Sequence, residues 1–154
     1  MMKKRRMVKV YRFIAIKHFY NLAGYLLPIL AVFVLILGTY GSIGGLYLAP
    51  ADYQQGDAFR IIYVHVPSAF LSLFIYLVMA MAAVIGLIFR IKLADLIVSG
   101  SVFLGSWFTF LALLTGSVWA KPMWGAWWVW DARLTSELIL LFLYLGVIAL
   151  RSAI

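Results

Sequence analysis

The sequence contains no cysteine and little charge, and acidic residues are especially few. Without cysteine, the 154 residues offer no disulfide, no thiolate metal ligand and no C-x-x-C-H motif for covalent cofactor attachment. Charged residues make up only 12% of the chain and hydrophobic residues 66%, so the polar surface that a soluble domain needs is missing. The composition therefore predicts an integral membrane protein.

The thirteen basic residues outnumber the five acidic ones, which gives a net charge of +8. Seven of them precede the first long apolar run: Lys3, Lys4, Arg5, Arg6, Lys9, Arg12 and Lys17. This clustering is typical of a topology determinant that contacts anionic lipid head groups, and it argues against nucleic acid as a partner. The apolar run that follows is too long for a signal peptide, so we expect it to remain as an anchor.

Four apolar runs are long enough to cross a bilayer, whose core of about 30 Å needs roughly 20 helical residues. The predicted spans cover about 22–44, 67–89, 96–118 and 134–150. The glycine-rich stretch 41–45 predicts the end of the first span. Pro67 predicts the first turn of the second span, with 61–66 as an interfacial lead-in. The predicted fold class is all-α integral membrane protein, with a basic cytoplasmic segment 1–21 and a four-span domain 22–150.

The basic residues also predict the orientation of the spans. The N-terminal segment, the turn 90–95 and Arg151 lie on one face and contribute seven, two and one Lys or Arg. The other face has only three, so the first face is predicted to be cytoplasmic. The chain is then a multi-pass protein of the bacterial inner membrane with its N-terminus in the cytoplasm. Both larger loops, 45–66 and 119–133, face outward.

Five of the six tryptophans lie within twelve residues, 119–130, in one outer loop. An interfacial aromatic belt needs only one or two aromatic residues at a span end, so this density exceeds what anchoring requires. If the segment is helical, one face carries a wide indole surface that suits a flat apolar macrocycle. That face would consist of Trp124, Trp127, Trp128 and Asp131. From the residues alone, an aromatic belt and a ligand surface remain equally good interpretations.

The stretch 121–138, KPMWGAWWVWDARLTSEL, resembles the tryptophan-rich WWD signature of haem-handling membrane proteins. It most resembles the cytochrome c maturation protein C family, also called haem exporter protein C. The upstream stretches 49–56 (APADYQQG) and 60–67 (RIIYVHVP) are similar to the same family. The resemblance runs from about the first span to the end of the chain, and its signature is long and specific.

This resemblance implies that a WWD segment at 119–137 binds haem b non-covalently on the periplasmic face. The haem would be presented to a periplasmic haem chaperone during cytochrome c biogenesis, and an ATP-binding-cassette complex would help to release the loaded chaperone. The candidate haem-contacting residues are His65, Trp119, Trp124, Gly125, Trp127, Trp128, Trp130, Asp131 and Arg133. Members of the family continue through two more spans with a second axial histidine between them. We therefore expect this chain to be the N-terminal portion of a six-span pattern.

The two histidines have different expected roles. His65 matches the first axial histidine of the family and lies on the same face as the tryptophans, where neutral imidazole can ligate haem iron. The alternative is an interfacial histidine bonded to a backbone carbonyl. His18 is expected about 30 Å away at the opposite face and is not expected to be a ligand. A water, Met123 or a second subunit remains open as the other iron ligand.

Several charged residues near the outer face have two interpretations each. Arg60 and Arg133 are candidates for binding haem propionates, and lipid phosphates are the alternative partner, favoured for Lys121. Asp131 is expected to cap the helix that follows it. Glu137 lies about a turn and a half into the fourth span and is expected to pair with Arg133, four residues earlier.

Three functions fit these observations. The first is a protein that binds and presents haem. The second is a transport subunit for haem or another substrate, which the apolar spans with few breaks disfavour. The third is a structural subunit or fragment of the same membrane assembly, in which the tryptophans serve only as a belt. An enzyme is not expected, because no nucleophile–base pair or metal-ligand cluster falls on one face.

Overall fold

The structure, a computed structural model, describes residues 16–153. Four helices in this part are long and apolar enough to cross a membrane: α2 (Ile16–Ile43), α3 (Ile62–Phe89), α4 (Lys92–Trp124) and α5 (Ala132–Ala153). A short π-helix, η1 (Gly44–Leu48), continues α2, and a 3-10 helix, η2 (Asp57–Ile61), leads into α3. The predicted all-α membrane fold with four spans is confirmed. Six of the seven N-terminal basic residues lie outside the described residues.

The helices run further than the predicted spans, and three predicted boundaries are wrong. The glycine-rich stretch 41–45 does not end the first span, because the helix continues in π form to Leu48. Pro67 lies inside α3 and not in its first turn. α4 extends to Trp124, through the first part of the segment predicted to be a loop. In a membrane each backbone amide needs a partner within the segment, which favours helical continuation through Gly and Pro.

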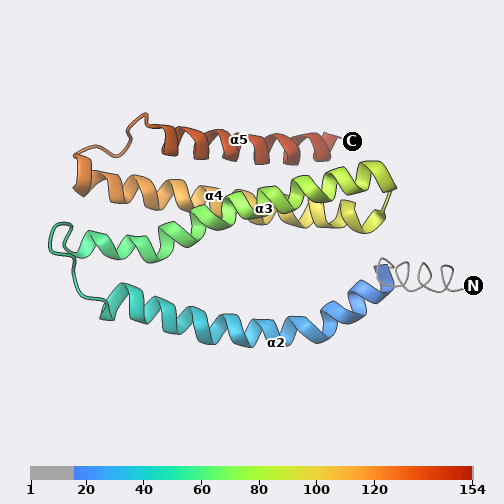
Figure 1. The fold of residues 1–154 in the computed structure, drawn as a ribbon, viewed down its shortest axis with the longest axis horizontal. Coiled ribbons are helices and arrows are strands. Elements are labelled where there is room, and N and C mark those ends of the chain that lie inside the picture. The colour runs from blue at the N-terminus through green and yellow to red at the C-terminus, as the bar shows by residue number, and fades with distance from the viewer. Residues whose placement is uncertain (1–15, 154) are drawn as a thin grey trace, which may run out of the picture.

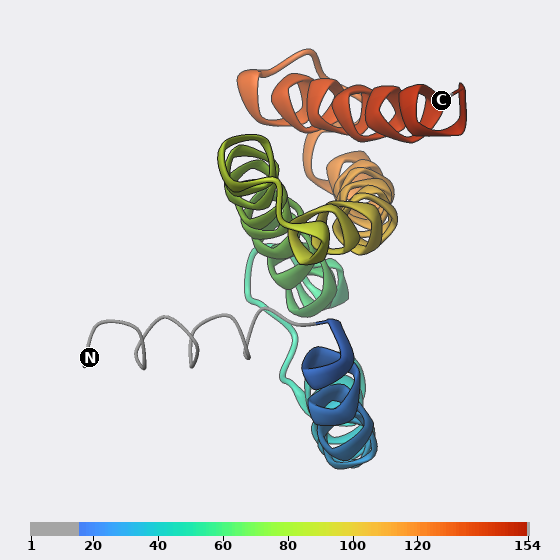
Figure 2. The ribbon, with the colours of Figure 1, turned by 90° about the vertical axis from the view of Figure 1, so that its right-hand side faces the viewer.

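Helices α3, α4 and α5 form a bundle in which α4 packs against both of its neighbours (Figure 1 and Figure 2). Its most buried part contains Met79, Val102, Leu140 and Tyr144. The ring of Tyr144 lies so close to Gly105 that a Cβ atom there would overlap it. The Tyr144 hydroxyl donates a 2.7 Å hydrogen bond to the backbone carbonyl of Ser72. α5 is therefore held against both other helices at one well-packed level.

Helix α2 stands apart from this bundle over most of its length, as both ribbon views show. None of its residues is buried by the rest of the protein. Contact is made at its end, where Gly45 of η1 lies against the ring of Tyr63 on α3 without room for a Cβ atom. α2 is thus joined to the bundle at one end only.

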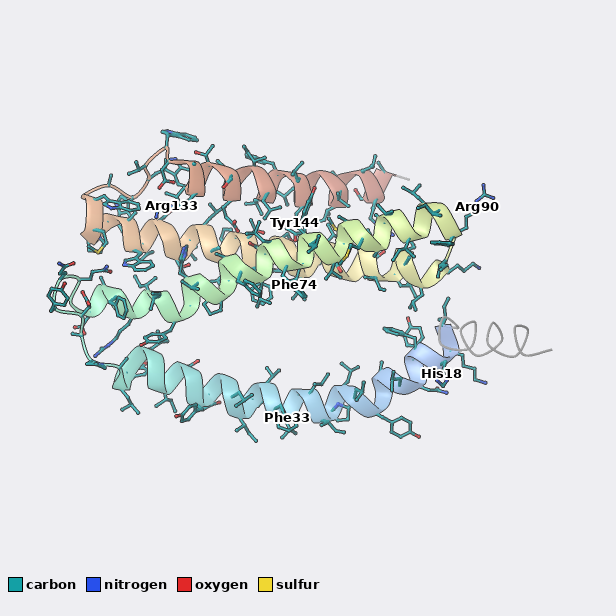
Figure 3. All side chains as sticks on the ribbon, in the orientation of Figure 1. His18, Phe33, Phe74, Arg90, Arg133 and Tyr144 are labelled. Carbon is teal, nitrogen blue, oxygen red and sulfur yellow. The ribbon has the colours of Figure 1, made fainter. Side chains whose placement is uncertain are left out.

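The two ends of the molecule carry different side chains, as Figure 3 shows. His18 and Arg90 lie at one end, and Arg133 lies at the other, beside the connection from α4 to α5. His18 is therefore a span length away from the tryptophan segment, as expected from the sequence. The end that carries Arg133 is called the outer end below.

Candidate functional site

His65 lies in the first turns of α3, and its ring nitrogen Nδ1 has two partners on α4. Nδ1 is 3.0 Å from the carbonyl oxygen of Ala112 and 3.1 Å from the hydroxyl oxygen of Thr115. The Thr115 hydroxyl donates its own hydrogen to Leu111 O, at 2.7 Å, so it can only accept from the imidazole. Both partners of Nδ1 are thus acceptors, and Nδ1 must carry the ring hydrogen. The neutral imidazole is left with an unprotonated Nε2.

Two residues of α4 shape the space around this imidazole. A Cβ atom on Gly116 would come within 3.1 Å of His65 Cε1, so the ring occupies the room that this glycine leaves. Trp119 packs edge-to-face against the imidazole, with ring centroids 5.7 Å apart. The Trp119 indole N–H donates a 2.9 Å hydrogen bond to the side-chain oxygen of Gln55. The ring planes of both His65 and Trp119 are thereby fixed by polar contacts.

Gln55 is placed by a tight turn in the outer loop before α3. The Asp52 carboxylate accepts hydrogen bonds from the backbone N–H groups of Gln54, at 2.9 Å, and Gln55, at 2.8 Å. Gly56 closes the turn with a φ of 57°, a conformation that glycine adopts without a steric cost. Sequence analysis did not single out Gln55, and the only available signal was its place in the stretch similar to the family.

The tryptophan segment is divided by the end of α4, which makes the predicted helical face wrong. α4 ends at Trp124, and Gly125 follows with a φ of 73°. The Gly125 N–H donates to Lys121 O at 3.0 Å, and the Lys121 ammonium group donates to Gly125 O at 2.9 Å. Because the chain is non-helical from here to Asp131, the tryptophans beyond Gly125 do not continue the face of Trp124.

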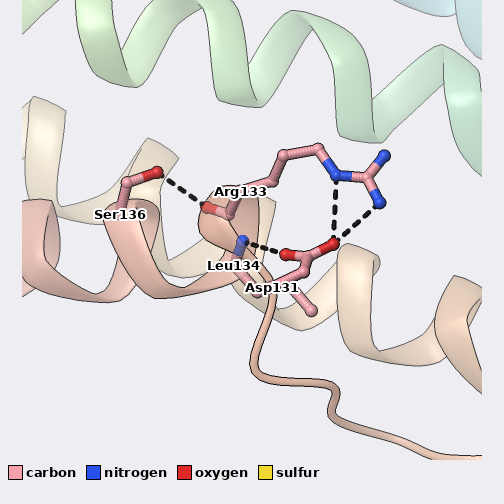
Figure 4. A network of polar contacts seen from close by, with 4 residues as sticks. All are labelled: Asp131, Arg133, Leu134 and Ser136. Carbon is pink, nitrogen blue, oxygen red and sulfur yellow. Dashed lines mark hydrogen bonds and ion pairs between the residues drawn. The ribbon is translucent and has the colours of Figure 1, made fainter.

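Asp131 caps α5, as the sequence predicts (Figure 4). Its carboxylate accepts a 2.8 Å hydrogen bond from the backbone N–H of Leu134 and a 2.7 Å charge-assisted bond from the Arg133 guanidinium. These two donors, the Leu134 N–H first, hold the pKa of Asp131 below its ordinary value. The carboxylate is therefore the stable form at neutral pH.

The prediction that Arg133 pairs with Glu137 is wrong. Arg133 bonds to Asp131 instead, and its guanidinium lies 5.5 Å from the centre of the Trp124 ring. One carboxyl oxygen of Glu137 is buried and has no hydrogen-bond partner in the described part of the chain. The guanidinium of Arg133 thus lies at the end of α4, while Glu137 is partly buried further along α5.

These side chains surround one cavity of about 340 Å³ at the outer end. This volume lies within the range of about 300–1,000 Å³ that is usual for small-molecule sites. Its lining consists of Gln55, His65, Gly116, Trp119, Ala120, Met123, Trp124, Asp131, Arg133 and Leu134. The cavity combines an imidazole, a guanidinium and two indoles in a mainly apolar wall. A larger apolar hollow of about 980 Å³ between α2, η1 and Tyr63 contains none of the predicted site residues.

Comparison with known proteins identifies the family. Residues 9–154 match the family model described as Heme exporter protein C. The chain belongs to the Heme exporter protein C family. The protein of this name from Escherichia coli is 58% identical over 131 residues, which cover 85% of this chain and 54% of the relative. The one from Haemophilus influenzae is 55% identical over 134 residues, which cover 87% and 54%.

A plant relative bears a more explicit name. The putative cytochrome c biosynthesis ccmC-like mitochondrial protein of Marchantia polymorpha is 49% identical over 116 residues, which cover 75% of this chain and 50% of the relative. The chain spans about half the length of the curated relatives it matches. The resemblance seen in the sequence is thus confirmed at the level of the family.

The structure gathers about half of the predicted site residues around the cavity. His65, Trp119, Trp124, Asp131 and Arg133 line the cavity, whereas Gly125, Trp127, Trp128 and Trp130 do not. Trp127 contacts Lys121, and Trp128 packs edge-to-face on Trp130. The indole nitrogen of Trp128 is buried and lacks a hydrogen-bond partner among residues 16–153.

Arg60, a propionate candidate, also lies outside the cavity lining. Its guanidinium donates to the carbonyl of Ala49 at 2.9 and 3.1 Å and pairs with Asp57 at 3.2 Å. These contacts tie the end of the outer loop to η2. The residues that line the cavity but were not predicted to do so are Gln55, Gly116, Ala120 and Leu134, while Met123 was named only as a possible iron ligand.

Proposed function

We propose that the chain binds haem b non-covalently at its outer end and presents it to a periplasmic haem chaperone during cytochrome c biogenesis. The observation that carries this proposal is the state of His65. Its Nδ1 hydrogen is directed to two acceptors on α4, so its Nε2 lone pair is available to a ligand at the cavity that His65 lines. A ring nitrogen held by a backbone carbonyl is the usual arrangement for a histidine that ligates a metal through its other nitrogen.

The rest of the cavity fits the other parts of haem. The indoles of Trp119 and Trp124 offer flat apolar walls to a macrocycle. Arg133 is 78% exposed at the rim, where a guanidinium can bind a propionate carboxylate. Met123 lies in the same lining and is a candidate for the second iron ligand. Bound haem would supply an iron for His65 Nε2 to ligate, and Trp119, Trp124 and Arg133 would orient and hold the macrocycle.

The proposed orientation follows from charge. His18, which directly follows the seven N-terminal basic residues in the sequence, and Arg90 of the α3–α4 turn lie at the end opposite to the cavity. Membrane-protein ends rich in Lys and Arg remain in the cytoplasm. The cavity then opens on the periplasmic side of a bacterial inner membrane, where a soluble chaperone can reach it. In this proposal an ATP-binding-cassette complex at the same membrane releases the loaded chaperone. The chain performs no enzymatic step, because presentation requires binding and release without bond-making by its residues.

A haem titration with matched histidine variants tests the proposal. The chain is purified in detergent, haem is added, and visible spectra are recorded for the wild type, His65→Ala and His18→Ala. We expect a histidine-ligated Soret band in the wild type and in His18→Ala, and a lost or shifted band in His65→Ala. A wild type without a specific band, or two variants with the same spectrum, would contradict the assignment.

A further inference from the structure

An amphipathic hollow lies at the end of the bundle opposite to the cavity, where α3 turns into α4. Its volume is about 520 Å³, and its charged residues are Arg90, Lys92, Arg151 and Asp95. The remaining lining is apolar and consists of Ala82, Ala83, Gly86, Leu87, Ile91, Ala94 and Val98. Three cations and one carboxylate thus surround a surface otherwise built from small and aliphatic side chains.

The one carboxylate of this hollow is already neutralised. Arg151 of α5 pairs with Asp95 at 2.9 Å and also bonds to the Ser99 hydroxyl. Among residues 16–153, neither Arg90 nor Lys92 forms an ion pair with a carboxylate. Both side chains are exposed, so two positive charges remain available at the opening.

The α3–α4 turn fixes the backbone positions of Arg90 and Lys92. Arg90 adopts a left-handed conformation with a φ of 51°, and its N–H donates a 2.8 Å hydrogen bond to Gly86 O. α4 starts only two residues later, at Lys92. Below the turn, a Cβ atom on Gly86 would lie 3.3 Å from that of Ala94, so the helices approach closely there. The charged opening therefore has a rigid apolar floor.

A second hollow lies on the opposite flank of this α3–α4 contact. It measures about 410 Å³ and is lined only by apolar side chains: Val78, Met81, Ala82, Ile85, Ile91, Leu93, Ala94 and Ile97. It shares Ala82, Ile91 and Ala94 with the charged hollow. Along the charged hollow, from Arg90 to Ala82, the helix rises about 12 Å. This length is close to half of a hydrocarbon core of about 30 Å, which is the depth of one leaflet.

We propose that the charged hollow binds one anionic phospholipid. Arg90 and Lys92 bind its phosphate, and one acyl chain lies along the apolar lining from Leu87 to Ala82. The charge of the opening fits an anionic head group, and basic pockets between membrane helices are known to take such lipids. The surface is separated from the haem cavity by the length of the bundle, so this inference does not depend on the proposed haem function.

Native mass spectrometry in detergent tests this site, with phosphatidylglycerol and phosphatidylcholine of identical acyl chains as probes. We expect the wild type to bind phosphatidylglycerol at least tenfold more tightly than phosphatidylcholine. Arg90→Gln and Lys92→Gln are each expected to weaken phosphatidylglycerol binding by about fivefold, because each removes one cation near a membrane surface. Their phosphatidylcholine binding should stay unchanged, which also shows that the variants are folded.

Lys17→Gln is the matched control, because Lys17 is a cation near the start of α2, at the same end of the protein, and does not line either hollow. We expect this variant to lose less than twofold. An equal loss in Lys17→Gln and Lys92→Gln would overturn the site in favour of unspecific charge attraction, and equal binding of the two lipids would overturn the anionic preference. Competition by millimolar inorganic phosphate would overturn the lipid assignment, since the site would then hold a free anion.

Discussion

The tryptophans of the 119–130 segment fall into two groups that their sequence does not distinguish. Trp119 and Trp124 belong to α4 and line the cavity together with His65. Trp127 and Trp130 lie beyond the end of α4 and are 57% and 75% exposed. The boundary between the groups is Gly125, whose left-handed conformation ends the helix. The position of the helix end therefore determines which indoles line the cavity. The number of tryptophans in the segment does not predict this.

The largest effect is expected from filling the space beside His65. In Gly116→Val the new side chain meets His65 Cε1 and Leu134, so the imidazole must leave its position. We expect the histidine-ligated Soret band to be lost and haem affinity to fall more than tenfold. Gly100→Val is the matched control on the same helix, because a Cβ atom at Gly100 meets nothing within 4 Å. An unchanged spectrum in Gly116→Val would show that the cavity wall does not hold the ligand.

The comparison itself is tested by exchanging one tryptophan from each group for leucine. Trp119→Leu removes the hydrogen bond to Gln55 and the ring contact with His65, and we expect about tenfold weaker haem binding. Trp130→Leu removes a largely exposed indole, and we expect less than a twofold change. Haem titrations followed at the Soret band measure both. Equal effects of the two substitutions would show that tryptophans of the cavity wall and of the α4–α5 connection do not differ in haem binding.

A smaller effect is expected at the rim of the cavity. Arg133→Gln removes the exposed guanidinium that lies over Trp124, so a propionate loses its ionic partner. We expect about threefold weaker haem binding at low ionic strength and a smaller difference at high salt, because an exposed charge is screened. Lys121→Gln, a cation of the same segment outside the cavity lining, serves as the control. A loss that does not depend on salt would point to a packing role for Arg133.

The smallest expected effect concerns the cap of α5 in acid. The pKa of Asp131 is lowered by the Leu134 N–H and the Arg133 guanidinium. Its carboxylate therefore contributes stability above the unfolded-state pKa of about 3.9, and this contribution is lost as pH falls through the lower folded-state value. Thermal unfolding between pH 6 and pH 3 should show a steeper decline for the wild type than for Asp131→Asn, which keeps a capping side chain without the charge. Parallel curves would contradict this assignment.

The sequence predicted the spans well because long apolar runs decide them, and it predicted their ends poorly. Glycine and proline usually end helices in soluble proteins, but the stretch 41–45 and Pro67 lie within helical segments here. A membrane leaves the backbone no alternative partner, so the helix continues through both: in π form from Gly44 to Leu48, and as an α-helix through Pro67. Boundary rules calibrated on water-exposed helices therefore fail at these positions.

For the candidate site, the resemblance to the family located the segments that form the cavity. Reasoning from neighbouring residues predicted only some of the contacts within it. The cap at Asp131 was predictable because an acidic residue before an apolar helix is a local signal. The contact of His65 with Ala112 and Thr115 was not, because it depends on the register between α3 and α4. The pairing of Arg133 with Asp131 could not be predicted from sequence spacing either. Residues four apart on a helix pair only when both side chains are in the same environment, and Glu137 is partly buried whereas Arg133 is exposed.

The isolation of α2 has a consequence for how the protein enters the membrane. Among residues 16–153, α2 buries none of its residues against the bundle, so these helices add little to its stability in lipid. α2, with a mean hydropathy of 2.3 over its most apolar window, can therefore leave the translocation channel as soon as it is made. The mean hydropathy of α5 is lower, at 1.8, and this helix carries Glu137. Its insertion into lipid is therefore favoured when α3 and α4 are already next to the channel and can pack against it. The order of synthesis would then set when each span is released into lipid.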